Sequence, residues 1–339
     1  MQSLTIVFNE NQIFFSITLS LVFTILAFKI LLPIFVSMKF LDNPTERSNH
    51  LTPISLGGGL VVVPLIILIP FSVGYHWNII QILTLLILFF ISLLDDFKNV
   101  KASLRLAIHF FSITIYVHFY LIDQITFFQE IERSYLIFLT YFFLILTISW
   151  FINAFNFMDG IDGITSVNIV YLTSSLILLN YYLGLNSSTL HYTIIGVTLG
   201  FLFFNWSPAN IFLGDSGSIP LGFLMITLLL DLALKGYWVA ALILPMYYIL
   251  DTSLTLIVRA YNRENFMQAH SQHFYQKAVR SGKTHKQVCY SIIVLSFGLF
   301  LFALSSVIEK NKVLFLILAL AWCVLFLLKF SKKKIKCHD

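Results

Sequence analysis

Eleven long apolar stretches divide this chain of 339 residues, and they constrain its fold more than any other feature. A helix that crosses a bilayer needs about 20 mostly apolar residues. The runs are continuous, whereas the strands of a transmembrane barrel alternate over about ten residues. The sequence therefore predicts one all-α polytopic membrane domain over 1–339, a bundle of 10–11 transmembrane helices. We place the spans at 13–37, 56–73, 78–94, 103–122, 135–152, 165–183, 191–206, 217–232, 236–259, 288–308 and 312–330.

The composition supports the membrane class and argues against others. Charged residues make up 11% of the chain, whereas soluble domains carry about 25%. The three cysteines show no CxxC spacing, so we expect no zinc site and no disulfide framework. The basic run 332–336 follows a spanning segment, where such runs act as topology signals or contact anionic lipids. We therefore expect membrane lipids as partners and no nucleic acid.

The distribution of positive charge predicts the orientation. With eleven spans and the N-terminus outside, the inner loops are 38–55, 95–102, 153–164, 207–216, 260–287 and the C-terminal tail. Of the 21 lysines and arginines, Lys29 lies within the first span and the outer loops hold Arg133, Lys235, Lys310 and Lys312. The remaining sixteen lie in or beside the inner loops. This bias places the inner loops in the cytoplasm, so we expect a multi-pass protein of a bacterial inner membrane with a cytoplasmic site.

The acidic clusters all fall in these inner loops. Asp95 and Asp96 end the third span. Adjacent helical residues diverge by about 100°, so the two carboxylates are expected to have different roles. One would ligate a cation and the other would face a substrate oxygen, which makes both candidate catalytic residues. A plain helix-end charge pair, neutralised by Lys98 and Lys101, is the structural alternative.

The segment 153–163 is the densest polar motif. Asn153, Asn156, Asp159 and Asp162 recur every third residue, and two Asp-Gly steps permit tight turns. These side chains offer the donors and acceptors that a ribose or a nucleobase edge requires. An Asx-turn that caps the next helix is the alternative.

The segment 214–218, Gly-Asp-Ser-Gly-Ser, places glycines on both sides of Asp215. Such glycines permit close approach of the backbone to a phosphate or a metal. Together with Asp95 and Asp96, Asp215 forms an all-oxygen donor set that favours Mg²⁺ or Mn²⁺. Mg²⁺ keeps several waters and bridges substrate phosphates through one or two carboxylates. We assign the metal to Asp215 and Asp95.

Two further inner loops carry cations and histidines. The first contains His50 and leads to a glycine run, 57–59, which serves either anion binding at a helix N-terminus or close helix packing. The loop 260–287 is the only long one and carries His270 and His273. We expect these histidines to make charge-assisted contacts with a diphosphate. Arg259 could assist, and Asp251 would pair with Arg259 or with a neighbouring helix.

Taken in order, these motifs resemble one family over nearly the whole chain. It is the polyprenyl-phosphate N-acetylhexosamine-1-phosphate transferases (the MraY/WecA superfamily, glycosyltransferase family 4). The match runs from Asp42-x-Pro44 and His50 through 94–96, 156–163 and 214–218 to the final histidine motif. The last loop reads His-Ser-Gln-His, whereas part of the family has a triple-His run there. The His-Ser-Gln-His sequence resembles the WbpL-like branch, which initiates O-antigen or related surface polysaccharides.

The resemblance implies a bundle whose active-site cleft transfers a sugar-1-phosphate from a UDP-N-acetyl sugar to undecaprenyl phosphate, with release of UMP. It implies Asp215 as the magnesium ligand and the Asp95-Asp96 pair as base or metal ligands. It places the nucleotide sugar near Asn153, Asn156, Asp159, Asp162, His50, Arg259, His270 and His273. Lys101 and Arg105 are assigned to the lipid phosphate, and a homodimer is plausible for the family.

Alternative functions remain open from the residues. One is the phospho-MurNAc-pentapeptide transferase of peptidoglycan synthesis. Another class is a secondary transporter, although transporter coupling sites lie near the bilayer midplane, whereas these aspartates lie at helix ends. A covalent two-step mechanism through an aspartate is a further possibility. The donor sugar and the oligomeric state are not fixed by the sequence.

Overall fold

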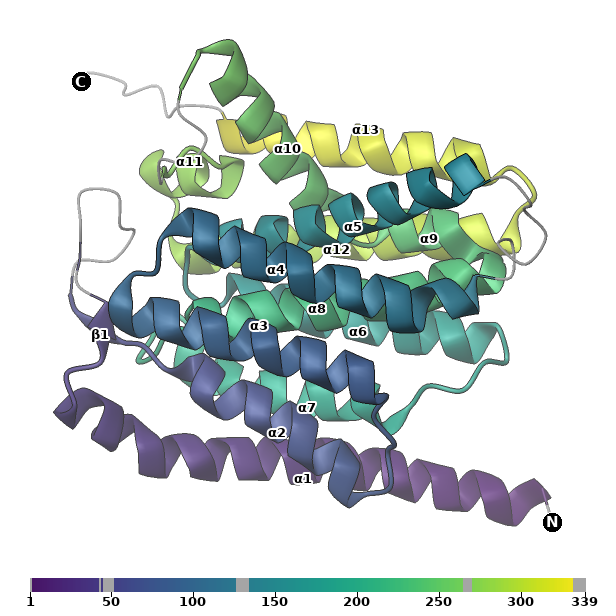
Figure 1. Ribbon diagram of the computed structural model, residues 1–339, viewed down its shortest axis with the longest axis horizontal. Coiled ribbons are helices and arrows are strands. Elements are labelled where there is room, and N and C mark those ends of the chain that lie inside the picture. Colours follow the sequence, from purple (N-terminus) through teal and green to yellow (C-terminus); the bar gives the residue numbers. More distant parts are fainter. Residues whose placement is uncertain (1, 43, 45–51, 126–133, 265–269, 332–339) are drawn as a thin grey trace.

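The computed structural model describes residues 2–42, 44, 52–125, 134–264 and 270–331, and it is almost entirely helical (Figure 1). The helices from the first half of the chain are α1 (Gln2–Ser37), α2 (Gly58–Ser72), α3 (Ile79–Lys98), α4 (Ala102–Tyr116), α5 (Ser134–Phe157) and α6 (Ile164–Tyr182). Those from the second half are α7 (Thr189–Asn205), α8 (Asp215–Leu232), α9 (Trp238–Ile243), α10 (Met246–Tyr261), α11 (Phe274–Arg280), α12 (His285–Ile308) and α13 (Lys312–Ser331). The predicted all-α polytopic class is confirmed.

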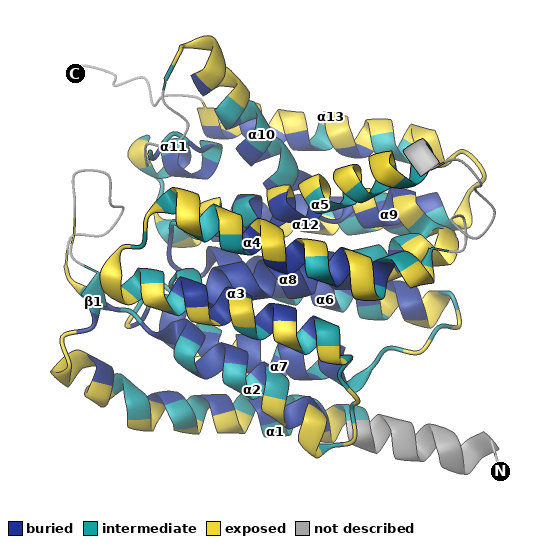
Figure 2. Cartoon of the chain, viewed as in Figure 1, coloured by how far each residue is buried: buried dark blue, intermediate teal, exposed yellow. Residues whose placement is uncertain are grey.

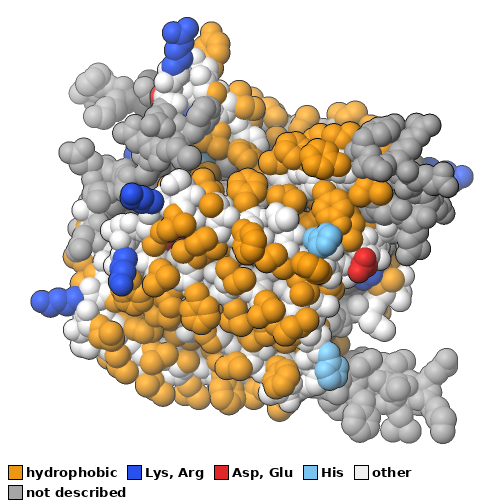
Figure 3. All heavy atoms as spheres, in the orientation of Figure 1, with side chains coloured by type: hydrophobic (Ala, Val, Ile, Leu, Met, Phe, Trp, Pro, Cys, Tyr) orange, Lys and Arg blue, Asp and Glu red, His pale blue; other side chains and the backbone are white. Residues whose placement is uncertain are grey.

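Eight helical stretches of the described chain are long and apolar enough to cross a membrane, and α2 and α7 are shorter apolar helices. Helix α1 begins at the right end of the bundle in Figure 1, and α13 ends at its left end. The chain therefore crosses the bundle an odd number of times between the start of α1 and the end of α13. Hydrophobic side chains cover the middle of the face shown in Figure 3, while most of its lysines and arginines lie at the left end. This band of apolar surface suits contact with lipid.

Helix α8 lies at the centre of the bundle, and α1 and α13 lie at its edges (Figure 2). Nearly every residue of α8 from Ser216 to Leu229 is buried. Gly222 lets α8 approach α5, because an added Cβ would lie 3.0 Å from the Cβ of Phe155. The site at the end of α8 is therefore held by a helix that touches neighbours on all sides.

The predicted ninth span, 236–259, is wrong as a continuous helix. The chain leaves α8 through the π-helical turn η4 (Ala233–Tyr237), where Gly236 has φ 93°. The return crossing then breaks between α9 and α10 at Leu244 and Pro245. Proline interrupts a helix because it lacks an N–H and its ring clashes with the preceding turn. The Tyr171 hydroxyl donates to the Leu244 carbonyl at this break, at 3.1 Å.

Capping interactions bound the helices at the end of the long polar loop. Thr284 caps α12, and its hydroxyl accepts the Gln287 N–H at 3.2 Å while the Gln287 side chain accepts the Thr284 N–H at 3.0 Å. Helix α11 ends at Ser281, followed by Gly282 with φ 97°. A short antiparallel ribbon of β1 (Leu41–Asp42) and β2 (Ile54–Ser55) lies at the same end of the bundle. Two short helical segments follow α4 and complete the fourth crossing: the π-helical η1 (Val117–Leu121) and the 3₁₀-helical η2 (Ile122–Gln124).

Small residues bring α1 and α7 together. A Cβ added at Gly196 would lie 2.4 Å from the Ile17 carbonyl oxygen, and one added at Gly200 would lie 2.7 Å from the Cβ of Thr24. Helices inside a membrane gain stability from such close backbone approach, since lipid supplies no hydrophobic drive between them.

We predict that Gly196→Val lowers the free energy of unfolding by about 1–3 kcal/mol, the usual cost of overpacking. Thermal unfolding of the purified protein in detergent measures it. Leu199→Val, at a partly exposed position of the same helix, is the control and should change stability little. Equal effects of the two substitutions would show that the α1–α7 contact is not tight.

Candidate functional site

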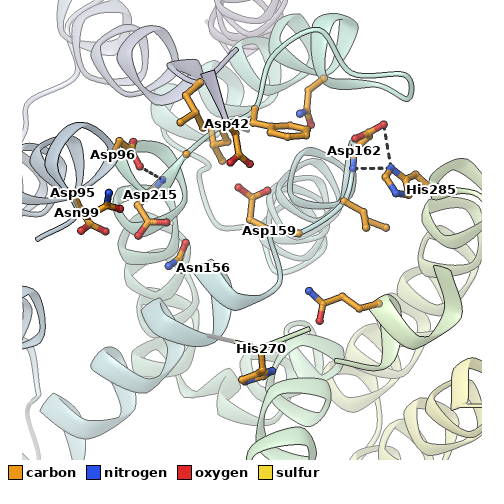
Figure 4. Close-up of a pocket in the computed structure, with 18 residues that line it drawn as sticks. Asp42, Asp95, Asp96, Asn99, Asn156, Asp159, Asp162, Asp215, His270 and His285 are labelled. Atoms are coloured by element: carbon orange, nitrogen blue, oxygen red, sulfur yellow. Dashed lines mark hydrogen bonds and ion pairs between the residues drawn. The ribbon is translucent and has the colours of Figure 1, made fainter. Parts of the chain in front are cut away.

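A pocket of about 510 Å³ lies at the end of the bundle where α3 ends and α8 begins. Figure 4 shows Asp95, Asp96 and Asp215 on one side, Asp162 with His285 on the other, and Asp159 between them. No lysine or arginine of the described chain lines it. Its polar lining residues are Asp42, Asp95, Asp96, Asn99, Asn156, Asp159, Asp162, Asn205, Asp215, His270, Gln276 and His285.

Asp96 joins the end of α3 to the start of α8. Its carboxylate accepts the backbone N–H groups of Asp215 and Ser216, at 2.9 and 3.0 Å. The first amides of a helix have no partner within the helix and carry its positive dipole end, so a carboxylate there is stabilising. Gly214, with φ 75°, is required beside it, because a Cβ would lie 2.7 Å from Asp96 Oδ2. Asp96 thereby holds Asp215 at the pocket.

Asp95 points to a different set of partners, as its helical offset from Asp96 predicts. Its Oδ1 accepts the Val100 N–H at 2.7 Å, which closes the end of α3. Its Oδ2 accepts a hydrogen bond from Nη1 of Arg105, the same nitrogen that donates to Asp215 Oδ2 at 2.7 Å. One guanidinium nitrogen thus links the two carboxylates that the sequence assigned to the metal.

The glycine run at 57–59 serves packing rather than anion binding. The N–H groups of Gly58 and Gly59 donate to the carbonyls of Phe212 and Leu213, at 2.9 and 2.8 Å. A Cβ at Gly59 would lie 2.4 Å from the Gly217 nitrogen. The start of α2 is therefore fixed against the loop that precedes Asp215, and these two amides are not available to a ligand.

The loop between α5 and α6 forms the centre of the pocket. Asn156 accepts a hydrogen bond from the Ser218 hydroxyl at 2.6 Å, and Asp159 accepts one from the Thr165 hydroxyl at 2.5 Å. The Tyr275 hydroxyl donates to the Phe157 carbonyl at 3.0 Å and supports the loop from α11. Burial raises the pKa of Asp159 to about 7, and the charges of Asp215 and Asp96 add to this rise.

Asp162 and His285 are in contact at the opposite side of the pocket, with Asp162 Oδ2 3.1 Å from His285 Nδ1. The Ala209 N–H also donates to this oxygen, at 3.3 Å. Burial raises the pKa of Asp162, but these hydrogen bonds and the His285 charge outweigh it and bring the pKa below its usual range. The two aspartates of this loop therefore differ, because the pKa of Asp162 is lowered and that of Asp159 is raised.

The predicted histidines differ in their positions. His270 lines the pocket, and burial, together with His273 and Arg259, lowers its pKa to about 4. Its ring faces the space in which a diphosphate is expected, and the charge-assisted contact stays a prediction. His273 is buried, with its Nδ1 3.1 Å from Asp251 Oδ1, and its ring stacks on that of His270.

Asp251 and Arg259 do not pair with each other. The Asp251 carboxylate caps α11 by accepting the N–H groups of Phe274 and Tyr275, at 3.0 and 3.3 Å. Arg259 is buried and lies 3.0 Å from Glu264 Oε2. Asp251 thus organises the histidine loop, and Arg259 does not line the pocket.

The structure brings together most of the predicted site but not all of it. Asn153 bonds back to the Ser149 carbonyl at 2.8 Å, and Lys101 is an exposed residue at the start of α4. His50 lies outside the described residues. The pocket also contains residues that sequence reasoning did not select. They are Asp42, Asn99, Asn205, Gln276 and His285. Asp42 stands in the Asp-x-Pro motif, but His285, the first residue of α12, belongs to none of the sequence motifs.

The donor chemistry fits a hard divalent cation. Six carboxylates line the pocket, and Asp95 Oδ2 and Asp215 Oδ2 both approach one cationic nitrogen. Among the described residues, no group of three or more His, Cys, Asp or Glu is arranged to hold a metal unaided. Mg²⁺ suits such a site, since it draws most of its ligands from water and substrate phosphates.

Asp159 makes the stability of the protein depend on pH. The folded chain holds this proton up to about pH 7, whereas an unfolded aspartate releases it near pH 4. Stability is therefore greatest below the unfolded value and falls as the pH rises through the folded one. We predict that, in EDTA, the melting temperature of the wild type falls relative to that of Asp159→Asn as the pH rises from 4 to 7. Asp123→Asn, at an exposed position, should retain the wild-type slope, and identical slopes in all three proteins would contradict this assignment.

Comparison with known proteins identifies the family. Residues 78–233, from the start of α3 to the end of α8, match the model described as Glycosyl transferase family 4. The chain is 24% identical over 302 residues to a probable undecaprenyl-phosphate N-acetylglucosaminyl 1-phosphate transferase of Bacillus subtilis, covering 85% of this chain and 82% of that protein. It is 30% identical over 251 residues to a phospho-N-acetylmuramoyl-pentapeptide-transferase of Streptococcus pneumoniae, covering 67% and 74%. The motif prediction is thereby confirmed, and the chain belongs to glycosyl transferase family 4, the polyprenyl-phosphate N-acetylhexosamine-1-phosphate transferases.

Proposed function

We propose that this protein transfers an N-acetylhexosamine-1-phosphate from a UDP-sugar to undecaprenyl phosphate and releases UMP. The pocket carries this proposal, because it gathers six carboxylates at the end of a membrane bundle. A site that accepts a lipid phosphate and a nucleotide diphosphate must neutralise several negative charges, and the carboxylates recruit the cation that does so. The printed activities of the two relatives described above support the same reaction class.

The pocket end of the bundle faces the cytoplasm in this proposal. The Lys and Arg bias of the loops supports that orientation. The nucleotide-sugar substrate and the Mg²⁺ cofactor are both found in the cytoplasm. The lipid acceptor would reach the pocket from the surrounding bilayer of a bacterial inner membrane. Lys101 and Arg105 at the start of α4 remain the candidates for its phosphate.

Asp215 and Asp95 would hold Mg²⁺, with Mn²⁺ as a substitute, and the ion supplies charge neutralisation on the diphosphate. Asp96 has a different role, because both of its oxygens already accept backbone amides of α8. It positions Asp215 rather than removing a proton. A phosphate monoester has a second pKa near ~6 and is mostly deprotonated at pH 7, so the reaction needs alignment more than a base.

In the reaction, an oxygen of the lipid phosphate attacks the β-phosphorus of the UDP-sugar. The bond between that phosphorus and the bridging oxygen breaks, and UMP leaves with the bridging oxygen. Positioning and electrostatic stabilisation dominate such phosphoryl transfers. Asn156, Asp159 and Asp162 would bind the nucleotide sugar, and His270 would contact it from the opposite wall.

For the pathway, we infer the initiation of an O-antigen or another surface polysaccharide. The last-loop sequence His-Ser-Gln-His supports this branch over peptidoglycan synthesis. The donor would then be a UDP-N-acetyl sugar without a peptide.

We predict Mg²⁺-dependent UMP release when the purified protein is incubated with undecaprenyl phosphate and a UDP-N-acetylhexosamine. Chromatography of the nucleotide products measures it across a panel of donors, with EDTA and lipid-free samples as controls. Release only from UDP-MurNAc-pentapeptide would assign the protein to peptidoglycan synthesis. No UMP from any donor, combined with ion-driven uptake in liposomes, would favour a transporter.

We predict that Asp215→Asn and Asp96→Asn each reduce kcat by about 100-fold or more, the usual effect of losing a charge-stabilising group. Asp96→Asn should also destabilise the protein by about 0.5–2 kcal/mol, because it weakens the N-terminal cap of α8. UMP release and thermal unfolding measure the two effects. Asp231→Asn, which removes a carboxylate paired with Lys235 at the other end of α8, is the matched control. Near-wild-type turnover in both site variants would refute the assignment.

A further inference from the structure

Arg105 pairs with two carboxylates at once through a single nitrogen. Its Nη1 contacts Asp95 Oδ2 and lies 2.7 Å from Asp215 Oδ2. Its helix, α4, follows α3 directly, so the ion pair ties three helices together at the wall of the pocket. About a quarter of its side chain is exposed. Arginine stays protonated at any physiological pH, so a permanent positive charge stands between these carboxylates.

The same two oxygens are the ones that a metal would need. Both oxygens of Asp96 are engaged by amides of α8, and Asp95 Oδ1 accepts the Val100 N–H. Asp95 Oδ2 and Asp215 Oδ2 converge on one point, Nη1 of Arg105, and a metal that bridges the two aspartates through these oxygens would need that position. A divalent cation at about 2.1 Å from each oxygen cannot share the space with the guanidinium.

We propose that Arg105 is a built-in counter-ion of Asp95 and Asp215, and that a divalent cation that bridges these carboxylates must displace it. This inference rests on the proposed function only for the presence of the metal. In the metal-free protein, the guanidinium neutralises carboxylates whose mutual repulsion would otherwise be large in a partly buried site. The protein thereby keeps an acidic pocket folded before any ligand arrives.

Displacement also gives Arg105 a second use. A released guanidinium is left without its carboxylate partners, and a phosphate can pair with it through two parallel hydrogen bonds. A phosphate that binds Arg105 therefore favours metal binding, and the metal favours phosphate binding to the same degree, since coupling of this kind is reciprocal. The metal and the phosphate ligand would then enter the pocket cooperatively.

Binding of Mn²⁺ alone tests the displacement without any turnover. The full-length protein in detergent is titrated with Mn²⁺, and free Mn²⁺ is measured by electron paramagnetic resonance. We expect Arg105→Gln to bind Mn²⁺ at least about tenfold more tightly than wild type, a change of about 1.4 kcal/mol. The metal-free variant should melt at a lower temperature and gain more from Mn²⁺.

The matched control is Lys98→Gln, which removes one positive charge from the exposed end of α3. Lys98 is not a partner of Asp95 or Asp215 in the structure, so its loss should change Mn²⁺ affinity by less than about twofold, the screened effect of a surface charge. Arg105→Lys keeps a competing cation and should remain near wild type. Unchanged or weaker Mn²⁺ binding in Arg105→Gln would overturn the inference, as would no binding to either protein.

A measurement on the wild-type protein covers the case in which Arg105→Gln does not fold. Phenylglyoxal modifies free guanidinium groups, and mass spectrometry follows the peptide that contains Arg105. We expect Mg²⁺ to accelerate modification of Arg105 and to leave that of Arg263 unchanged. The same rate with and without Mg²⁺ contradicts displacement. If Mn²⁺ binding and phenylglyoxal modification give the expected results but the protein releases no UMP, the proposed reaction is refuted and the role of Arg105 is not.

Discussion

The hydrogen bonds from the first amides of α8 to the Asp96 carboxylate organise the rest of the site. Without a partner, the N-terminal amides of a buried helix would be costly in an apolar bundle. The carboxylate satisfies two of them and fixes the end of α3 against the start of α8. Asp215, the first residue of α8, is consequently held beside Asp95 and Arg105. One short-range interaction thus positions the charges that define the pocket.

The surrounding elements make this arrangement rigid. Helix α8 is buried along its length, so its first residue cannot shift without displacing several neighbours. The amides of Gly58 and Gly59 bind the loop before Asp215, and Asp251 caps the short helix α11 under the opposite wall. A dense group of carboxylates is thereby kept in place by backbone amides and buried packing, which leaves its net negative charge available to attract cations.

Much of the fold could be predicted from hydropathy and local signals. The apolar runs depend on neighbours in the sequence, and the structure confirms that they are helical; the capping box at Thr284 and the C-cap of α11 at Ser281 are interactions of the same local kind. The continuous span at 236–259 was wrong, because hydropathy does not register the break that Pro245 introduces. His285 was missed as a pocket residue, since its partner Asp162 lies 123 positions away in the sequence.

The sequence by itself determined the membrane class, the approximate limits of most apolar helices, and the aspartate motifs between them, because these follow from composition and from local spacing. The tertiary structure alone decided which polar group meets which. The packing of α3, α4 and α8 brings Arg105 to two carboxylates, and that of α2 brings the amides of the glycine run to carbonyls rather than to an anion. Such pairings depend on distances between helices, which no local pattern contains.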